Sequence, residues 1–189
     1  MLVRLAATIS LSLGSSALLP AKPMAQAGVS DPQIALPDGE VSKAGPFTAW
    51  LIDPTTRYNH GVLGDAIEAG GFVVERGKKR LVYRLAPDAV FADRRVRLAD
   101  LNGDGVPEAI IVKAHLQRGA AIAVYRIGAD RIDPLAESEA IGMRNRWLNP
   151  IGVADFAGTG KPMIAAIITP HLAGSLRLYS LSGSTLNGG

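Results

Sequence analysis

The chain of 189 residues contains no cysteine, which excludes disulfide bonds and a catalytic thiol and leaves the redox compartment unspecified. It also lacks the G-x-S-x-G elbow of serine hydrolases. Gly158-Thr159-Gly160-Lys161 partly matches a phosphate-binding loop, but Asp155 stands where that pattern requires glycine, and Pro162 stands where it requires serine or threonine. The sequence therefore contains no recognisable catalytic motif, and we expect a protein that is not an enzyme.

A broad excess of positive charge is also missing beyond the first 27 residues. The chain has 20 basic and 17 acidic residues, but Arg4 and Lys22 lie in that first segment, which contains no acid. The remainder is nearly neutral and offers no broad electrostatic footprint for nucleic acid. The local cluster Arg76-Gly77-Lys78-Lys79-Arg80 lies between two apolar runs and predicts the solvated tip of a hairpin.

The N-terminal apolar run is shorter than the roughly 20 residues of a membrane-spanning helix. This run, residues 5–19, follows Arg4 and precedes Ala25-Gln26-Ala27, an A-x-A cleavage site. The pattern predicts a signal peptide over residues 1–27, cleaved after Ala27, which implies a periplasmic or secreted protein with no membrane span after cleavage. No cysteine follows the apolar run, so a lipoprotein anchor is excluded.

Residues 28–46 are rich in Pro, Gly, Ser and acids without a sustained period, and they predict a flexible arm or linker. Strand-like segments then follow at short intervals, so residues 47–189 are expected to form one all-β domain of antiparallel strands. Helix is expected only in short pieces, at 63–69 or 134–141. The predicted strands cover residues 47–52, 71–75, 81–85, 95–99, 109–114, 120–127, 152–155, 163–169 and 175–181.

The segment with the clearest chemistry is residues 100–108, in which oxygen-bearing side chains stand at positions 1, 3, 5 and 9 and glycines permit tight turns. This spacing suits a hard cation, and Ca²⁺ better than Mg²⁺, which retains its own waters. An EF-hand would need Glu at position 12, where the chain has Ile111, so the loop leads into a strand. A polar hairpin turn without metal is the alternative. The candidate ligands are the side chains of Asp100, Asn102, Asp104 and Glu108 and the carbonyl of Val106.

The frame of this loop recurs 55 positions later, where Asp155 corresponds to Asp100. Glycines and a proline are kept at 158, 160 and 162, but Ala157, Thr159 and Met163 replace Asn102, Asp104 and Glu108. We therefore expect the second loop to keep its shape without a metal.

Tyrosines mark the same repeat. Tyr125 lies 25 residues after Asp100, and Tyr179 lies 24 residues after Asp155. Upstream, Tyr83 follows Asp65, so residues 64–68 are a candidate for the opening of an earlier repeat whose loop has lost its ligands.

Asp-Leu-Asn-Gly-Asp-Gly-Val-Pro-Glu followed by a β run resembles the FG-GAP/VCBS repeat of integrin-α-like β-propellers, here in a bacterial exported protein. The resemblance covers roughly residues 50–181. It implies a partial propeller of about three antiparallel blades and a structural Ca²⁺. Because a propeller typically needs four to eight blades, we expect either a chain shortened from a longer propeller or self-association through an open edge strand.

The resemblance implies a scaffold or an interaction module for a protein or glycan ligand. The alternatives are the non-catalytic fragment of a secreted polysaccharide-active hydrolase or lyase, and a carbohydrate-binding module. Trp50 and Trp147 each precede Leu and a Pro turn and either stack ligands or pack in the core. His115 and His171 occupy equivalent repeat positions, where they either line a site or are copied turn residues.

Overall fold

The computed structural model describes residues 35–61, 64, 66–172 and 174–189, and the predicted signal peptide lies outside them. The described residues form an all-β protein without a helix, so none of them belongs to a helix that could cross a membrane. The strands are β1 (Ser42–Ala44), β2 (Phe47–Thr55), β3 (Glu68–Arg76), β4 (Lys79–Arg84), β5 (Ala89–Phe91), β6 (Arg97–Ala99), β7 (Glu108–His115), β8 (Gly119–Ile127), β9 (Ile132–Glu137), β10 (Leu148–Ala154), β11 (Met163–Ile168), β12 (Ser175–Ser182) and β13 (Thr185–Gly188).

Every strand predicted from the sequence is present, whereas β1, β5, β9 and β13 are additional. The prediction of a helix at 134–141 is wrong, because β9 occupies this segment as far as Glu137. Pro134 lies opposite Tyr125 where the pairing of β8 and β9 shifts its register. Proline is tolerated at such an irregularity because no ladder hydrogen bond is required from its nitrogen.

The ordered domain begins before residue 47. The backbone N–H of Leu36 donates to Leu51 O at 3.1 Å, and the Leu36 side chain is buried. β1 then pairs with β2 in a hairpin around Gly45, which has a positive φ of 53°. The described end of the segment assigned to an arm, residues 35–46, is therefore packed on β2.

The strands form a nine-stranded and a four-stranded sheet. The nine-stranded sheet runs β1-β2-β3-β5-β7-β8-β9, with β4 on β3 and β6 on β7, and the smaller sheet runs β10-β11-β12-β13. β5 connects the two halves of the larger sheet, because Phe91 pairs with Ala69 of β3 and also with Lys113 of β7. Two groups of strands that are far apart in the sequence thereby become one sheet.

Strand pairing reveals three repeated units, which we call the first (47–84), second (97–137) and third (148–188) unit. In each unit a residue of the second strand lies opposite a tyrosine of the third strand and an aliphatic residue of the first. An aspartate follows that aliphatic residue by two positions. The matched sets are Leu51, Asp53, Phe72 and Tyr83; Leu98, Asp100, Ala109 and Tyr125; and Val153, Asp155, Ile164 and Tyr179.

This register confirms the repeat between the second and third units, because Ala99 pairs with Glu108 just as Ala154 pairs with Met163. It also places Asp53 at the repeat position in the first unit. Asp65, the candidate from the sequence, lies outside the described residues.

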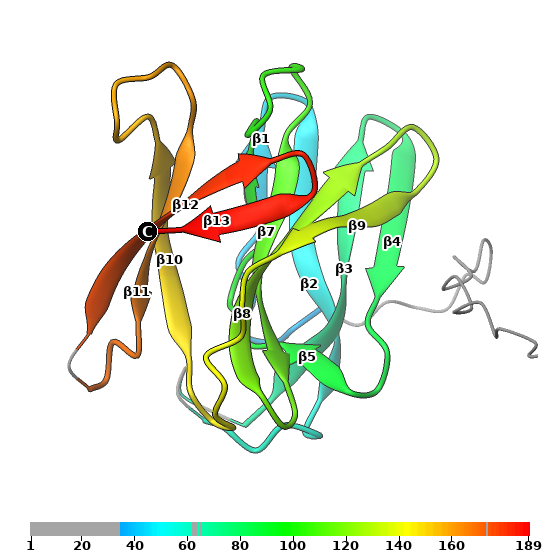
Figure 1. Ribbon diagram of the computed structural model, residues 1–189. Coiled ribbons are helices and arrows are strands. Elements are labelled where there is room, and N and C mark those ends of the chain that lie inside the picture. Colours follow the sequence, from blue (N-terminus) through cyan, green and yellow to red (C-terminus); the bar gives the residue numbers. More distant parts are fainter. Residues whose placement is uncertain (1–34, 62–63, 65, 173) are drawn as a thin grey trace, which may run out of the picture.

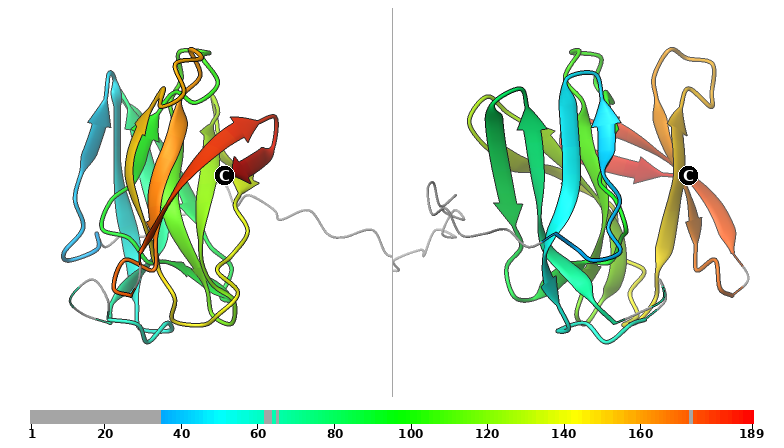
Figure 2. Two further views of the ribbon diagram at one scale, coloured as in Figure 1. Left: turned by 60° about the vertical axis from the view of Figure 1, so that its left-hand side comes forward. Right: turned by 180° about the vertical axis from the view of Figure 1, so that it is seen from behind.

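The second unit lies between the other two (Figures 1 and 2). Side chains of a strand alternate between the two faces of its sheet, and on β7 both sets are buried. Ala109 and Ile111 belong to a core shared with the first unit, while Ile110 and Val112 belong to a core shared with the third. In Figure 1, β10 and β11 accordingly lie beside β7 and β8 on the side away from β2 and β3.

The two interfaces differ in which faces meet. The first and second units pack through their tyrosine-bearing faces, with the Tyr83 and Tyr125 ring centroids 4.7 Å apart. The third unit packs its own tyrosine-bearing face, with Ile164 and Tyr179, against the opposite face of the second unit. If the tyrosine-bearing face of a unit is called its front and the opposite face its back, the second and third units stack front to back, whereas the first and second units meet front to front.

Gly119 at the start of β8 offers a test of this packing. It has a φ of 76°, and a methyl group added to it would lie 2.1 Å from the carbonyl oxygen of Met143. Gly119→Ala should therefore destabilise the protein by clearly more than the roughly 1 kcal/mol of a left-handed alanine alone. Gly77→Ala is the matched control, because Gly77 has a φ of 60° with nothing near its added methyl group. Urea unfolding of both variants checks the prediction, and equal losses would contradict it.

Candidate metal loop and neighbouring pocket

Asp100 closes the loop that joins β6 to β7. Its Oδ1 accepts a hydrogen bond from Gly103 N at 2.7 Å, and its Oδ2 accepts one from Gly105 N at 2.8 Å. These glycines have φ values of 80° and 82°, a region that other residues rarely adopt. The backbone hydrogen bonds, that of Gly105 above all, lower the pKa of Asp100 and hold it as a carboxylate.

Asn102 and Asp104 repeat this local pattern within the loop. Asp104 N donates to Asn102 Oδ1, and Val106 N donates to Asp104 Oδ1, each at 2.8 Å. Short polar side chains favour such bonds to the backbone two residues on. The alternation of polar side chains therefore folds the loop into successive tight turns and fixes their oxygens.

Glu108 begins β7, and its side chain is only 2% exposed. Its Oε2 accepts from Leu101 N at 2.9 Å, and its Oε1 accepts from Asn102 Nδ2 at 2.7 Å. Burial raises the pKa of Glu108, and the negative charges of Asp104 and Asp100 add to that rise against the opposing Leu101 hydrogen bond. The loop thus holds a buried carboxylate close to two others.

An amide group bridges two of the acids in this loop. Asn102 Nδ2 lies between two carboxylates, since it also donates to Asp104 Oδ2 at 3.1 Å. Among the described residues, no group of three or more His, Cys, Asp or Glu side chains is arranged to hold a metal by itself. A cation in this loop would therefore need oxygens from Asn102 and from the Val106 backbone as well as the carboxylates.

The loop between β10 and β11 keeps the positive-φ glycines and the bond from the residue five positions after the aspartate, while its second bond comes from the residue four positions on instead of three. Asp155 Oδ1 accepts from Thr159 N at 3.0 Å, and Oδ2 accepts from Gly160 N at 2.7 Å. Gly158 and Gly160 have φ values of 66° and 76°. The prediction that this loop keeps its shape is confirmed, and the frame depends on the aspartate and the glycines rather than on the other acids.

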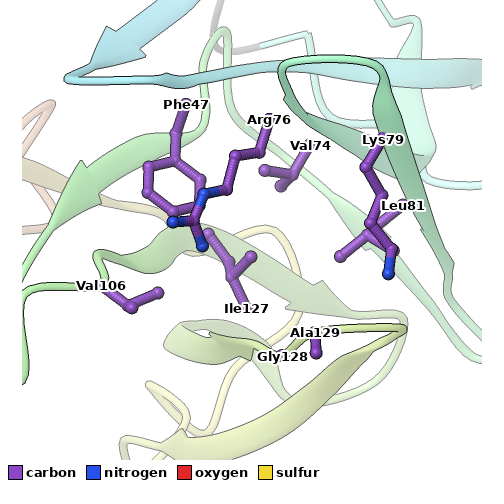
Figure 3. A pocket seen from close by; sticks show the side chains of 9 residues that line it. All are labelled: Phe47, Val74, Arg76, Lys79, Leu81, Val106, Ile127, Gly128 and Ala129. Carbon is purple, nitrogen blue, oxygen red and sulfur yellow. The ribbon is translucent and has the colours of Figure 1, made fainter.

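A pocket of about 500 Å³ lies beside the first of these loops, between the β3–β4 hairpin and the β8–β9 turn (Figure 3). The predicted hairpin tip is confirmed, with Arg76 paired to Lys79 across the turn. Lys79 forms an ion pair with Asp130, while Arg76 pairs with no acid among the described residues. The Arg76 guanidinium instead lies 5.1 Å from the Phe47 ring centroid. The lining residues are Phe47, Val74, Arg76, Lys79, Leu81, Val106, Ile127, Gly128 and Ala129.

The structure does not bring His115 and His171 together. His115 Nε2 contacts Glu137 Oε1, and Lys113 Nζ lies 2.7 Å from Glu137 Oε2. Burial raises the pKa of Glu137, but the hydrogen bonds from Lys113 and His115 outweigh it and lower the value. His115 therefore lies in a polar cluster with Glu137 and Lys113 at the end of β7.

His171 instead lies beside His60, with ring centroids 6.4 Å apart, and the Tyr58 ring also contacts His60, with centroids 5.7 Å apart. Nothing in the spacing of these residues indicates the pairing. It arises because loops of the first and third units meet beyond the second unit.

The tryptophans differ in accessibility. Trp147 is buried, and its Nε1 donates to Ala92 O at 2.9 Å, so its ring packs in the core. Trp50 is half-buried on β2, with Arg80 lying 5.4 Å from its ring centroid. Only Trp50 is therefore placed to stack against a ligand.

Comparisons of the chain with protein-family models, curated proteins and solved structures find no match.

The histidine pair predicts a pH dependence of stability. Burial lowers the pKa of His60, and the positive charges of His171 and Arg146 lower it further. The unfolded chain then binds this proton more readily than the folded protein, so stability is complete above about pH 6.5 and falls as the pH drops through the depressed pKa. Below about pH 6.5, His60→Gln should flatten the dependence of the melting temperature on pH, and His171→Gln should flatten it partly. A slope that survives in His60→Gln would assign the effect to other groups.

Proposed function

We propose that this chain is an exported, calcium-binding repeat protein that acts as a scaffold and ligand-interaction module. The observation that carries the proposal is that Val106 belongs both to the loop with the clustered carboxylates and to the wall of the pocket. A cation bound in the loop would hold Val106 in place and so fix the side of the pocket that Val106 lines. The signal-peptide pattern of residues 1–27 supports export.

The residues that would hold Ca²⁺ are Asp100, Asn102, Asp104 and Glu108 through their side chains and Val106 through its carbonyl. The ion would supply positive charge to a loop in which burial, and after it the charges of Asp104 and Asp100, raise the pKa of Glu108. Glu108 is the first residue of β7, so a fixed Glu108 would also fix the start of the central strand. The role assigned to calcium is therefore structural.

The propeller-type architecture is part of the proposal, since the resemblance to FG-GAP/VCBS repeats rests on the same loop. The front-to-back stacking of the second and third units supports it, as does their shared strand register. The first unit departs from such stacking, because it meets the second unit face to face and shares β5 with it. A regular pair of stacked blades is thus proposed for residues 97–188 alone.

The pocket favours a ligand with an apolar body and an acidic group. Phe47, Val74 and Leu81 line it with hydrocarbon, and a volume of about 500 Å³ falls within the range of small-molecule sites. Arg76, which has no acidic partner among the described residues, would pair with the acid of the ligand.

Calcium binding is tested by calorimetric titration and thermal melting of the purified protein. The parent should bind about one equivalent, and at 100 times the Kd it should gain about 2.7 kcal/mol of stability. Asp104→Ala should lose both effects. Thr159→Ala is the matched control, since Thr159 is the equivalent position in the third unit, and it should bind calcium like the parent. A folded parent that binds no calcium would overturn the metal site and leave a polar turn.

The pocket is tested separately with octanoate as the probe and 1-octanol as its uncharged analogue. Arg76→Gln should weaken octanoate binding about tenfold or more, because a charged hydrogen bond is lost, and should leave 1-octanol unaffected. Lys78→Gln is the matched control, since Lys78 is exposed in the same turn but does not line the pocket. Equal binding of octanoate by all three proteins, or none by the parent, would contradict the assignment.

A further inference from the structure

Three segments meet at the end of the molecule where β2 finishes and β10 begins, which is the lower end in Figures 1 and 2. The backbone N–H of Asn145 donates to the Tyr58 hydroxyl at 3.1 Å, which joins the segment before β10 to the segment after β2. The backbone N–H of Thr169, in the turn after β11, donates to Trp147 O at 2.9 Å. The three segments are therefore held close together although they lie far apart in the sequence.

Two residues in these segments have strained backbones. Asn145 has a φ of 58° and Thr169 has a φ of 46°, and they are two of the three non-glycine residues with positive φ in the described part of the chain. A β-branched residue such as threonine rarely adopts this region. Strain of this kind persists only where the surroundings fix it, and it gathers at ligand sites. The strain therefore distinguishes this end of the molecule as a candidate binding site.

The side chains that meet here are basic. The His60 and His171 ring centroids lie 6.4 Å apart, and Arg146 is close enough for its positive charge to act on His60. None of these three side chains forms an ion pair with an acid among the described residues. The cluster therefore gathers basic groups without a counter-ion from the described part of the chain.

The spacing of the two rings favours an anion over a metal ion. An imidazole nitrogen lies about 1.1 Å from the ring centre, so rings that bind one zinc ion at about 2.1 Å with a tetrahedral angle have centres about 5.2 Å apart. Rings that donate to one oxygen at about 2.9 Å can have centres up to about 8 Å apart. The observed 6.4 Å therefore suits a shared acceptor oxygen better than a tetrahedral metal ion. The charge of Arg146 also opposes a cation and favours an anion.

The accessible nitrogens define how a ligand would bind. His60 Nδ1 is buried and has no hydrogen-bond partner among the described residues, so Nε2 is the ring nitrogen that can meet a ligand. His171 is exposed in its turn, so a ligand can enter from solvent. The guanidinium of Arg146 and one N–H of each imidazole ring are donors, whereas the oxygens of an oxyanion are acceptors. The cluster thus complements an oxyanion whose oxygens face several directions.

We propose that His60, His171 and Arg146 bind a tetrahedral oxyanion, a sulfate or a phosphate group. The two histidines would donate to one oxygen, and Arg146 would donate to others. The site is separate from the calcium loop and the pocket, because β2 runs from Phe47, which lines the pocket, to Thr55, just before the segment that carries His60. It therefore does not depend on the function proposed above.

Oxyanion binding is linked to the protonation of His60. A bound dianion would offset the positive charges of His171 and Arg146, so it would raise the pKa of His60, while Tyr58 stays neutral because burial raises its pKa. Sulfate keeps both charges over this range, so it should bind more tightly at about pH 5.5 than at about pH 7.5, where His60 is neutral. The titratable and charged groups at the site are His60, His171, Tyr58, Glu68, Arg144 and Arg146.

The test is NMR of the purified full chain, titrated with sodium sulfate at constant ionic strength. The chain has three histidines, so His60→Gln, His115→Gln and His171→Gln assign the three ring C–H signals. The His60 and His171 signals should shift along one saturating curve, whereas the signal of His115, which contacts Glu137, should not move. Inorganic phosphate is titrated in the same way, and the tighter of the two ions identifies the preferred group.

Arg146→Gln should weaken sulfate binding at least about tenfold, because a charged hydrogen bond is lost. Arg126→Gln is the matched control, since it removes the same charge from an exposed residue of β8 and should bind sulfate like the parent. Circular dichroism checks that both variants remain folded. Absence of a saturating shift with either anion, or equal weakening in both variants, would overturn the site. Zinc ions that shift both histidine signals where neither anion does would replace it with a metal site.

Discussion

The burial of both faces of β7 and β8 is the constraint on which the arrangement of the other strands depends. Odd and even residues of these strands enter different cores, so neither set is satisfied by a single neighbouring sheet. The first unit covers one face and the third unit covers the other. A near-continuous apolar run such as Ala109-Ile110-Ile111-Val112 indicates a strand that is buried on both faces. A strand with one solvent-exposed face would alternate apolar and polar residues instead.

Local features of the sequence predict much of this fold because they act over a few residues. Apolar runs of strand length locate β2, β7 and β8, and the Asp and Gly spacing predicts the loop frames at Asp100 and Asp155. The strands that sequence reasoning missed are short or rich in polar residues. β5 has only three residues, and Thr185–Gly188 contains one buried side chain, Leu186, so neither shows a measurable period.

The features that sequence reasoning could not supply depend on which strands become neighbours. The pocket joins Arg76 of a hairpin to Val106 of the metal loop, and His60 meets His171 across the second unit. Repeat position suggested that His115 and His171 are equivalent, but His115 is the last residue of β7, whereas β11 ends at Ile168 and His171 lies in the turn beyond it. The first unit, in addition, is turned relative to the other two. A repeat in sequence therefore fixes the shape of each unit without fixing how units face one another.

The short strand β5 affects which part of the protein unfolds first. It pairs with both β3 and β7, so the first and second units share a hydrogen-bonded ladder and cannot separate without breaking it. The third unit has a sheet of its own and meets the second through side-chain packing. Next to it, Trp147, the residue before β10, donates a single bond from Nε1 to the carbonyl oxygen of Ala92, the residue after β5. Local unfolding should therefore release the third unit first, and its amide protons should exchange with solvent sooner than those of β7 and β8.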